Sequence, residues 1–335
     1  PSFTQNWLIN CKHKIAKLIV QAREINKFHN TFLSSIMKYQ VKGRIHAEIN
    51  QLRSDHGGTV SGRLSMSNPN LQQVPARNKE LGPLIRSLFI PEEGHRWGSF
   101  DYSQQEPRMT VHYASSIGNG YEGSTELVEA YHKASADFHQ TVADLVGIER
   151  TQAKTIGLGL MYGMGKNRLA TSLGVSKDEA NLLISKYNRK VPFVKMLSDR
   201  CMETANEKGV IRTKKGRKCR FDKWEPKDFG LYTAETFENA VAKYGRDNIK
   251  RAFTYKALNR LIQGSSADQT KQAMLACHEE GYLPILQLHD ELCFNINKFS
   301  MKDVQDIKKI MENCIEFKVP FIVDTNLGES WGDIK

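Results

Sequence analysis

The chain has 335 residues, 40% hydrophobic and 25% charged, which is ordinary for a soluble globular protein of one large multi-lobed domain or two to three smaller ones. Its net charge of +11 favours an anionic partner, most commonly a nucleic acid, although a lysine excess can also serve solubility alone. The six cysteines show neither a C-x-x-C pair nor a zinc spacing, no run approaches ~18 apolar residues and no signal peptide is visible, so we expect reduced thiols and no membrane partner.

Taken in chain order, the first half of the sequence predicts helices on either side of loop-rich and strand-like regions. The glycines and prolines of residues 41–75 predict loops with short strands. Residues 84–103 predict a strand, a turn and a second strand. Helical spacing of apolar residues predicts two helices within 6–40 and further helices over 104–115 and 124–147.

The second half predicts more helices and then a return to strands. Ser176 is the expected N-cap of one helix, and Pro192 is expected to close it. Residues 225–250 are polar and charged, and we expect an inserted or mobile segment there. The other predicted elements are a helix from residue 149, a helix over 193–208, a hairpin over 209–224, a helix over 251–280, a strand over 282–296, a helix over 302–317 and a C-terminal strand.

Two strand-like runs that lie far apart in the sequence each carry an aspartate. Asp101 ends the first run, and apolar residues bracket the triplet His289-Asp290-Glu291 in the second. Burying an unpaired carboxylate costs several kcal/mol, so such a triplet usually lies at a turn, in an ion pair or on a metal. We expect Asp101 and Asp290 to meet across one sheet and to hold a metal ion.

The run RTQAKTIGLGLMYG predicts a helix with two cations on one face. Arg150, Lys154 and Leu158 are four residues apart, so they drift by only ~40° around the helix, and Tyr162 lies farther round. Two cations one turn apart repel slightly, which suits a face that binds a polyanion such as a triphosphate. The two glycines in the run each cost roughly 1 kcal/mol and indicate a bend or a close approach by something flat. A solvated basic helix is the simpler alternative.

Two further blocks are rich in side chains that bind the hydrogen-bonding edges of bases. The first is GRLSMSNPNLQQVPAR, from Gly62 to Arg77, which includes Arg63. The second is ALNRLIQGSSADQ, in which Asn259 and Gln263 lie one turn apart on a helix and can reach a minor groove. For either block alone, ordinary polar surface is the favoured interpretation.

Together, these four blocks resemble, in order, those of the family A DNA polymerases, the group of bacterial DNA polymerase I and its phage and mitochondrial relatives. DYSQQEPR resembles motif A, RTQAKTIGLGLMYG resembles motif B, LQLHDELCF resembles motif C and GRLSMSNPNLQQVPAR resembles the block that precedes motif A. The resemblance runs from about Cys11 to the C-terminus, except for residues 225–250. It implies an α+β right-hand fold with an antiparallel palm sheet, helical fingers and a shortened helical thumb.

The resemblance implies template-directed DNA synthesis from deoxynucleoside triphosphates on a primer–template. Asp101, Asp290 and the backbone carbonyl of Tyr102 would hold two Mg²⁺ ions, for which Mn²⁺ can substitute, and Lys154 would join the two aspartates as a catalytic residue. The implied nucleotide-binding residues are Arg86, Gln104, Glu106, His139, Arg150, Lys154, Leu158 and Tyr162. The implied DNA-binding residues are Arg63, Asn259, Gln263 and His289.

Glu106 and three departures from the family pattern concern the choice of nucleotide. By resemblance, Glu106 crowds the sugar 2′ position and so favours a DNA product. Leu158 stands where the family has an aromatic ring, Gln105 replaces an apolar residue, and Pro107 fits only the first turn of a helix. We expect catalysis to survive and fidelity and sugar discrimination to be altered, because these positions are expected to flank the nucleotide pocket.

The expected domain organisation follows the same resemblance. Few residues precede Arg63, so we expect either a C-terminal fragment or a reduced thumb, with a weak grip on duplex DNA and low processivity. We expect a monomer in the cytoplasm of a bacterial cell or phage-infected host, and the relaxed motif A favours a phage. The expected parts are a thumb stem over 1–60, palm over 61–115, fingers over 116–250 with an insertion at about 225–250, and palm again over 251–335.

Two rival functions remain open from the sequence. The first is a related nucleotidyl transferase: Glu106 argues against a single-subunit RNA polymerase, and the triplet at Asp290 argues against a reverse transcriptase, in which two adjacent aspartates are expected. The second is a non-catalytic DNA-binding subunit that kept the fold. The presence of Asp101, Asp290, Arg150 and Lys154 argues against this loss of activity.

Overall fold

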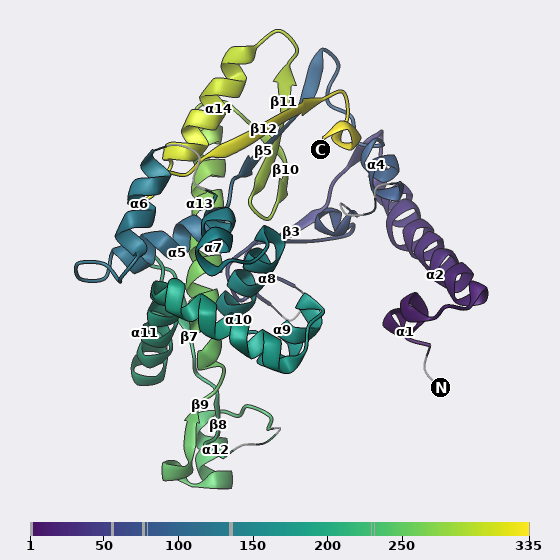
Figure 1. The fold of residues 1–335 in the computed structure, drawn as a ribbon. Coiled ribbons are helices and arrows are strands. Elements are labelled where there is room, and N and C mark those ends of the chain that lie inside the picture. The colour runs from purple at the N-terminus through teal and green to yellow at the C-terminus, as the bar shows by residue number, and fades with distance from the viewer. Residues whose placement is uncertain are drawn as a thin grey trace.

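A four-stranded antiparallel sheet, the central sheet of the fold, lies in the upper part of the molecule in Figure 1. The computed structural model describes residues 3–54, 57–75, 78, 80–133, 137–228, 230 and 232–334. The expected antiparallel sheet is therefore confirmed. β5 is the longest strand among the described residues and pairs on both sides, so the sheet joins Ser99 to Glu291, which is 192 positions away, and Tyr102 to Val323, which is farther still along the chain. In spatial order the strands are β10 (Pro284–Leu288), β11 (Glu291–Asn297), β5 (His95–Tyr102) and β12 (Val323–Gly328).

Side-chain alternation along β5 and β11 gives the sheet two different faces. Phe100 and its partner Leu292 are fully buried in the larger core, on the face that α13 (Ala257–Glu279) and α14 (Met301–Asn313) cover. The opposite face carries Trp97, which belongs to a second, smaller core, and ends at Asp101. On one face of the strand Gly98, Phe100 and Tyr102 are thus buried, and the other face ends in a carboxylate.

Gly98 allows β5 and β11 to pair closely. A Cβ atom added at Gly98 would lie 2.5 Å from Cγ1 of Ile296 on the neighbouring strand, so a larger residue would force the strands apart. The same strand places Phe100 edge-to-face against Phe294, with ring centroids 5.4 Å apart. Both contacts fix the register that also sets the position of Asp101.

The N-terminal part is helical at first and then forms short strands and loops, as expected. Residues 84–90, however, were expected to be a strand, and that prediction is wrong, because they begin inside helix α4 and continue as loop. The Asn78 side chain accepts the backbone N–H of Leu81, and Pro83 fits the first turn of the helix. The elements are α1 (Gln5–Asn10), α2 (Lys14–Lys27), a π-helical stretch (Phe28–Leu33), α3 (Ser34–Tyr39), β1 (Gln40–Val41), β2 (Arg44–Ile45), β3 (Glu48–Asn50), β4 (Ser65–Ser67), a 3-10 turn (Leu71–Gln73) and α4 (Leu81–Arg86).

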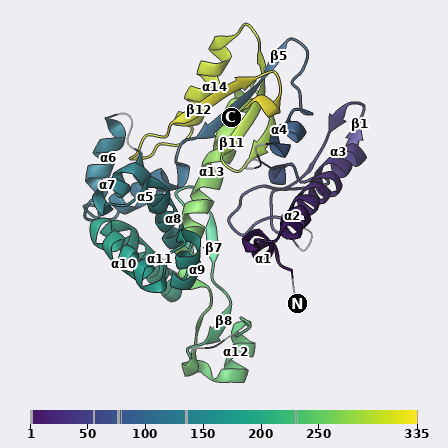
Figure 2. The same ribbon diagram turned by 45° about the vertical axis from the view of Figure 1, so that its right-hand side comes forward.

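Seven consecutive described helices follow β5 and gather on one side of the molecule (Figure 2). Ser176 caps α10 through a capping box, as expected. Pro192 does not only follow α10, since it also begins α11, where its missing N–H costs nothing. The helices are α5 (Gln105–Ser115), α6 (Ser124–His132), α7 (Phe138–Val146), α8 (Arg150–Met161), α9 (Lys166–Leu173), α10 (Lys177–Lys190) and α11 (Pro192–Lys208).

Residues 209–251 form a hairpin and a small projecting unit (Figure 1). The predicted hairpin is confirmed as β6 (Val210–Arg212) and β7 (Lys218–Arg220), with Gly216 at φ 87° in the turn. The expected insertion is folded where it is described. It consists of β8 (Trp224–Pro226), α12 (Phe237–Tyr244) and β9 (Ile249–Arg251), held by stacking of Arg251 on Trp224.

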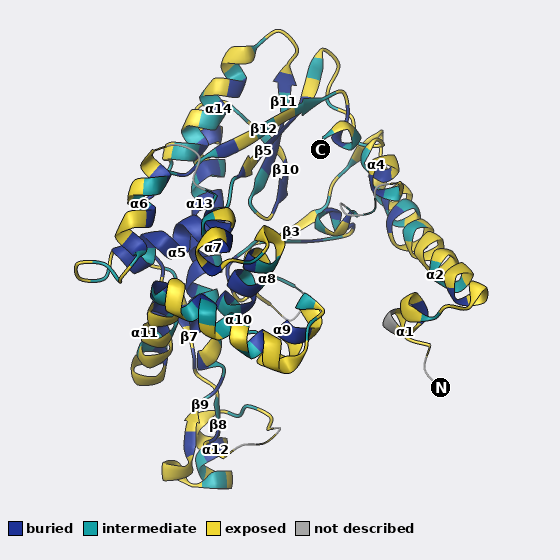
Figure 3. Ribbon diagram, viewed as in Figure 1, coloured by how far each residue is buried: buried dark blue, intermediate teal, exposed yellow. Residues whose placement is uncertain are grey.

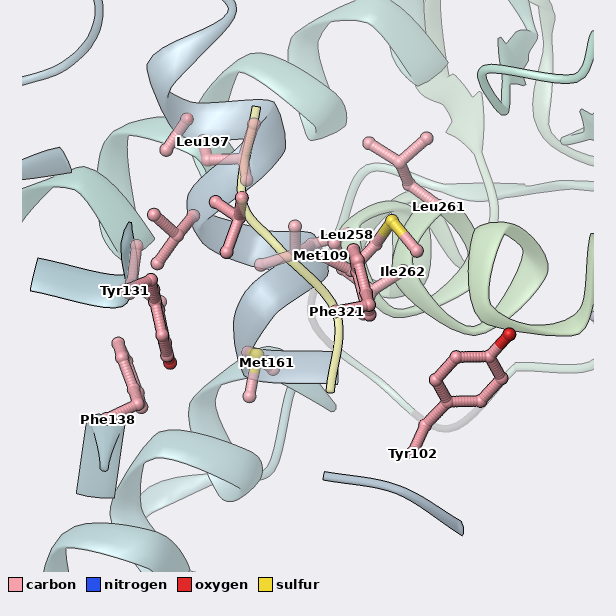
Figure 4. Packing of buried hydrophobic residues seen from close by; sticks show 14 of the residues in the cluster. Tyr102, Met109, Tyr131, Phe138, Met161, Leu197, Leu258, Leu261, Ile262 and Phe321 are labelled. Carbon is pink, nitrogen blue, oxygen red and sulfur yellow. The ribbon is translucent and has the colours of Figure 1, made fainter. Parts of the chain in front are cut away.

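Helix α13 is the main support of the fold, and Figure 3 shows it buried along most of its length. Figure 4 shows part of the larger core, in which α13 packs against α5 through residues such as Leu258 and Met109. Gly264 allows the turn of the β6–β7 hairpin to approach, because an added Cβ would lie 3.1 Å from Cγ2 of Thr213. Within the described ranges, no helix combines the length and apolar character that a membrane crossing requires.

Candidate active site

Asp101 and Asp290 lie side by side at one end of the central sheet. β10 and β11 are joined by a two-residue turn, His289-Asp290, in which His289 adopts φ 57°. The backbone carbonyl oxygen of Asp290 accepts the N–H of Tyr102 at 3.3 Å, and Glu291 pairs directly with Asp101. The structure thus brings together the two carboxylates that the sequence analysis placed across one sheet, and it puts the charged triplet at a turn.

The surrounding protein disfavours the charged forms of these two carboxylates. Asp101 keeps a solvent-exposed surface, yet desolvation by the surrounding protein and then the charge of Asp290 raise its pKa to about 8. Burial also raises the pKa of Asp290, although the nearby guanidinium of Arg63 opposes this rise. A divalent cation held between the two aspartates would relieve their repulsion.

The donor set suits a hard cation such as Mg²⁺. Two carboxylates and a backbone carbonyl are oxygen ligands, and Mg²⁺ commonly binds one or two carboxylates and completes its shell with substrate phosphates and water. In the described part of the chain, no cluster of three or more His, Cys, Asp or Glu side chains has metal-binding geometry. The residues present therefore fit a metal site that is completed by a substrate and not by the protein alone.

Two other acids lie beside Asp101: Asp324, which sequence reasoning missed, and Glu291, which it named only as part of the charged triplet. Asp324 of β12 pairs with Asp101 on the side away from β11, and its charge contributes to the raised pKa of Asp101. Glu291 is held by the Ser99 hydroxyl at 2.5 Å, so one of its oxygens is already occupied. Asp324 carried no sequence signal, because only the pairing of β12 with β5 brings it to this end of the sheet.

The expected triphosphate residues gather partly at the first turns of α7 and α8. Arg150 begins α8 and makes an ion pair with Asp137, and Lys154 is exposed one turn later on the same helix. His139 on α7 is buried, and its Nδ1 has no hydrogen-bond partner within the described part of the chain. Burial is the main cause that lowers the pKa of His139 to about 4, and Lys154 adds to this effect, so the imidazole is neutral at pH 7. Asp137 is a further residue that sequence reasoning missed.

Gln104 connects this helical region to the sheet. It follows β5 with φ 53°, and its Oε1 accepts the backbone N–H of Phe138 at 2.9 Å. Gln104 therefore lies between the strand that carries Asp101 and the start of α7.

Glu106 on α5 is the centre of a cluster of four expected site residues. Its Oε1 accepts Nη2 of Arg63 at 2.7 Å, and its Oε2 accepts the hydroxyl of Tyr162. Tyr162 also bonds to Gln263 on α13, and burial followed by the charge of Glu106 raises the pKa of Tyr162. The cluster joins α5, α8, α13 and the loop before β4, so it fixes the orientation of the Glu106 carboxylate.

The three departures from the family pattern occupy different environments. Gln105 is buried and donates to Gln269 Oε1 at 3.1 Å, so its side chain faces α13. Pro107 is in the first turn of α5, as expected. Leu158 is half-buried on α8. Gly157 and Gly159 let α8 pack against its neighbours, since a Cβ added at Gly157 would lie 3.1 Å from the Tyr187 hydroxyl.

The remaining predicted residues are spread around the sheet. Arg86 stacks over Trp331 at 4.7 Å, and its Nε is buried without a partner. Asn259 is half-buried on α13, and His289 is exposed at the turn beside Asp290. Arg77, at the end of the GRLS block, lies outside the described residues.

Gln72 links the GRLS block to the turn that carries Asp290. Its Nε2 donates to Gln287 Oε1 at 3.1 Å, and Nε2 of Gln287 donates to the His289 carbonyl oxygen at 2.6 Å. Gln287 had no sequence signal, and it supports the conformation of the turn from the neighbouring strand.

Comparisons with known proteins agree with this geometry. A family profile described as DNA polymerase family A matches residues 2–333. The DNA-directed DNA polymerase of Pseudomonas phage M6 is 38% identical over 99% of this chain and 53% of its own length. The DNA polymerase I of Caldicellulosiruptor bescii is 32% identical over 97% of this chain and 36% of its own length. The chain thus spans about half or less of the length of these relatives.

A solved structure shares the fold. The polymerase domain of Pol1 from M. smegmatis, in complex with DNA primer-template and dNTP, superposes with a TM-score of 0.80 and 26% identity, covering 98% of this chain and 55% of that chain. The α+β polymerase fold expected from the sequence is therefore confirmed. From the profile match over almost the whole chain, the chain belongs to DNA polymerase family A.

Proposed function

We propose that this chain carries out template-directed DNA synthesis, extending a primer 3′-hydroxyl with deoxynucleoside triphosphates. The observation that carries the proposal is the meeting of Asp101 and Asp290 at the end of the central sheet, where the surrounding protein disfavours their charged forms. Membership of family A and the likeness to a polymerase domain bound to primer-template and dNTP support the same reaction.

Asp101, Asp290 and the carbonyl oxygen of Tyr102 are the residues that would hold Mg²⁺. When bound, two Mg²⁺ ions would supply activation of the primer hydroxyl and neutralisation of the leaving pyrophosphate. Tyr102 itself is fixed from behind, because its buried hydroxyl donates to the Met311 carbonyl oxygen at 2.6 Å. That anchor holds the end of β5, and with it the Tyr102 carbonyl and the Asp101 carboxylate, in one orientation.

The cations of α8 would bind the incoming triphosphate. Arg150 and Lys154 are exposed one turn apart, so both can reach the same polyanion. Neutral His139 would donate one hydrogen bond without adding charge, and Lys154 would serve as the catalytic cation toward the leaving pyrophosphate. Arg86, Gln104 and Leu158 remain proposed nucleotide-site residues.

The Glu106 cluster would select deoxynucleotides. A carboxylate held by both Arg63 and Tyr162 cannot easily turn away, so it would obstruct a sugar 2′-hydroxyl. Gln263, bonded to Tyr162, would contact the minor groove of the primer-terminal pair together with Arg63 and Asn259.

The hairpin β6–β7 offers a basic surface for the DNA backbone. Residues 209–223 contain seven Lys and Arg residues and one Asp. Arg212 and Lys218 are exposed and face each other across the two strands, a like-charge pairing that is unfavourable unless an anion lies nearby. The hairpin packs on α13, which carries Asn259. The anions that would lie between these side chains are the phosphates of the primer–template. The affinity for DNA would therefore fall steeply with salt concentration.

Primer extension tests the proposal. The wild-type chain is given a short primed template, deoxynucleotides and Mg²⁺, with Mn²⁺ and ribonucleotides in parallel, beside Asp290→Asn and the control Asp306→Asn. Asp306 is on α14 and its carboxylate accepts the Tyr282 hydroxyl at 3.2 Å, so this control tests loss of charge away from the site. We expect extension with deoxynucleotides and either metal by wild-type and Asp306→Asn, and none by Asp290→Asn.

The rival functions give different results in the same assay. Extension with ribonucleotides alone would indicate an RNA polymerase. DNA binding without primer extension in the presence of either metal ion would indicate a non-catalytic DNA-binding subunit. We propose a monomer acting in the cytoplasm of a bacterial or phage-infected cell, in keeping with the phage and bacterial relatives.

A further inference from the structure

The N-terminus of α7 is capped by side chains from two directions. Asp137 Oδ1 accepts the backbone N–H groups of His139 at 2.9 Å and Gln140 at 3.2 Å. The preceding N–H, that of Phe138, donates to Gln104 Oε1 at 2.9 Å. The first turn of the helix therefore has its free N–H groups satisfied without any ligand.

The second oxygen of Asp137 binds Arg150. Asp137 Oδ2 accepts both Nε and Nη2 of the guanidinium at 2.7 Å. These two donors lie on one edge of the planar group, so Nη1 is turned away from the carboxylate. The Arg150 side chain is 45% exposed. The ion pair therefore orients the arginine while leaving further donors accessible.

The cap alone does not explain why an acid stands at position 137. An N-cap needs one side-chain oxygen, which asparagine supplies equally well. Burial opposes ionisation of Asp137, but the hydrogen bonds from Arg150 and from the helix N–H groups lower its pKa, so the carboxylate is charged at neutral pH. The charge therefore serves Arg150, because it holds one edge of the guanidinium.

A buried and unused polar atom lies on the same helical turn. His139 is 4% exposed, and its Nδ1 has no partner among the described residues. Leaving such an atom unpaired costs free energy unless something binds it. Asp137 therefore orients the Arg150 guanidinium and binds the backbone N–H of His139, and both residues retain unused hydrogen-bonding capacity in their side chains.

We propose that Asp137 is a positioning residue for triphosphate recognition, which caps α7 with one oxygen and aims Arg150 at the phosphates with the other. The inference rests on the proposed function. Asp137 does not touch the nucleotide and acts only through Arg150 and the start of α7. It stays paired with Arg150 in the complex, because the phosphates use the other donors of the guanidinium.

The test compares Asp137→Asn with Asp144→Asn. Asparagine keeps the cap and removes the charge. Asp144 is an exposed acid on the same helix that accepts Gln140 Nε2 at 2.7 Å, so Asp144→Asn is a matched loss of charge. In single-nucleotide incorporation on a primed template, we expect Asp137→Asn to raise KM for the nucleotide roughly tenfold with kcat within about twofold. Asp144→Asn should leave both parameters unchanged.

A double-mutant cycle shows whether Asp137 acts through Arg150. Adding Asp137→Asn to Arg150→Ala should produce no further rise in KM. If Asp137→Asn raised KM by the same factor in the wild type and in Arg150→Ala, the proposal would be contradicted. It would also be contradicted by an unchanged KM in Asp137→Asn, or by a loss of kcat and thermal stability with KM unchanged, which would indicate a merely structural cap.

Equilibrium binding separates this inference from the proposed function. dCTP is titrated onto the protein bound to a primed template whose primer ends in a dideoxynucleotide, so no turnover occurs. Wild-type binding that weakens roughly tenfold in Asp137→Asn supports the inference even if extension fails. If the wild type extends primers and Asp137→Asn binds dCTP as tightly as the wild type does, the inference about Asp137 is refuted and the proposed function stands. Wild-type protein that binds no dCTP refutes both.

Discussion

The carboxylates at the end of the sheet and the cations at the start of α7 and α8 are held by different kinds of contact. Asp101 and Asp290 owe their places to backbone pairing between β5 and β11 and to the turn between β10 and β11. Arg150 owes its orientation to one side chain, that of Asp137. Backbone register changes only when the whole sheet rearranges, whereas an ion pair is lost with one substitution. Chemistry and nucleotide binding should therefore be separable by mutation.

The largest effect is expected at the sheet. Asp101→Asn keeps the size of the side chain and the backbone pairing, and it removes one negative charge from the proposed metal site. We expect kcat for primer extension to fall by roughly 10³-fold or more, because metal assistance supplies several kcal/mol and each 1.36 kcal/mol is a factor of ten. The melting temperature should not fall, since the substitution also relieves carboxylate repulsion. A variant that retains more than a tenth of wild-type kcat would exclude Asp101 as a metal ligand.

The Glu106 cluster gives a smaller effect on the choice of sugar. Glu106→Ala removes the carboxylate, and Tyr162→Phe removes only one of the two donors that hold it. We expect discrimination against ribonucleotides to fall roughly 100-fold in the first and less than about tenfold in the second. Competing incorporation of dCTP and CTP measures both. If Tyr162→Phe matched wild type, the hydrogen bond would have no part in orienting Glu106.

Leu158 lies on the same helix as Arg150 but contributes only apolar contact. Leu158→Phe adds a rigid ring at a half-buried position, which should change misincorporation several-fold while kcat for correct nucleotides changes less than about threefold. The measurement is the rate of incorporation opposite a mismatched template base. Equal misincorporation before and after the change would show that this position does not influence fidelity.

The smallest effect concerns stability and pH. Burial lowers the pKa of His139 in the folded chain to about 4 from an ordinary value of 6.5, so the unfolded chain binds a proton first as the pH falls. The contribution of neutral His139 to the free energy of unfolding is therefore fully present above about pH 6.5 and is lost as the pH falls toward about 4. Denaturant titrations at several pH values should show that the free energy of unfolding falls less steeply between about pH 6.5 and 4 in His139→Gln than in the wild type. Burial also lowers the pKa of His112, so both proteins should still lose part of their free energy of unfolding over the same pH range.

The sequence predicted the sheet end better than the helical region, for a physical reason. One strand-like run ends in Asp101 and the other carries Asp290 within it, so the two have few ways to pair, and the antiparallel register follows from the buried faces of Phe100 and Leu292. The second run was expected to be one strand, but it forms two, β10 and β11, on either side of the turn at Asp290. The Ser176 cap and the β6–β7 hairpin were also predictable, because caps and turns are local. The motifs gave the family, and the profile match confirmed it.

The contacts between distant side chains could not be predicted. Arg63, Glu106 and Tyr162 are separated by 43 and 56 residues, and only the packing of α5 against α8 and α13 makes them neighbours. Asp137 before an apolar helical run was a visible N-cap signal, but its pairing with Arg150 depends on how α7 and α8 pack. The missed helix α4 had local signals in Asn78 and Pro83 that the apolar residues after them obscured.

The central claim is that Asp101 and Asp290 together hold the metal ions of the reaction. Anomalous diffraction from crystals of the chain with Mn²⁺, a dideoxy-terminated primed template and a matching deoxynucleotide tests this directly. The account predicts manganese peaks within bonding distance of both carboxylates and of the nucleotide phosphates, and their loss in Asp101→Asn. Manganese bound elsewhere, or bound unchanged in Asp101→Asn, would contradict it.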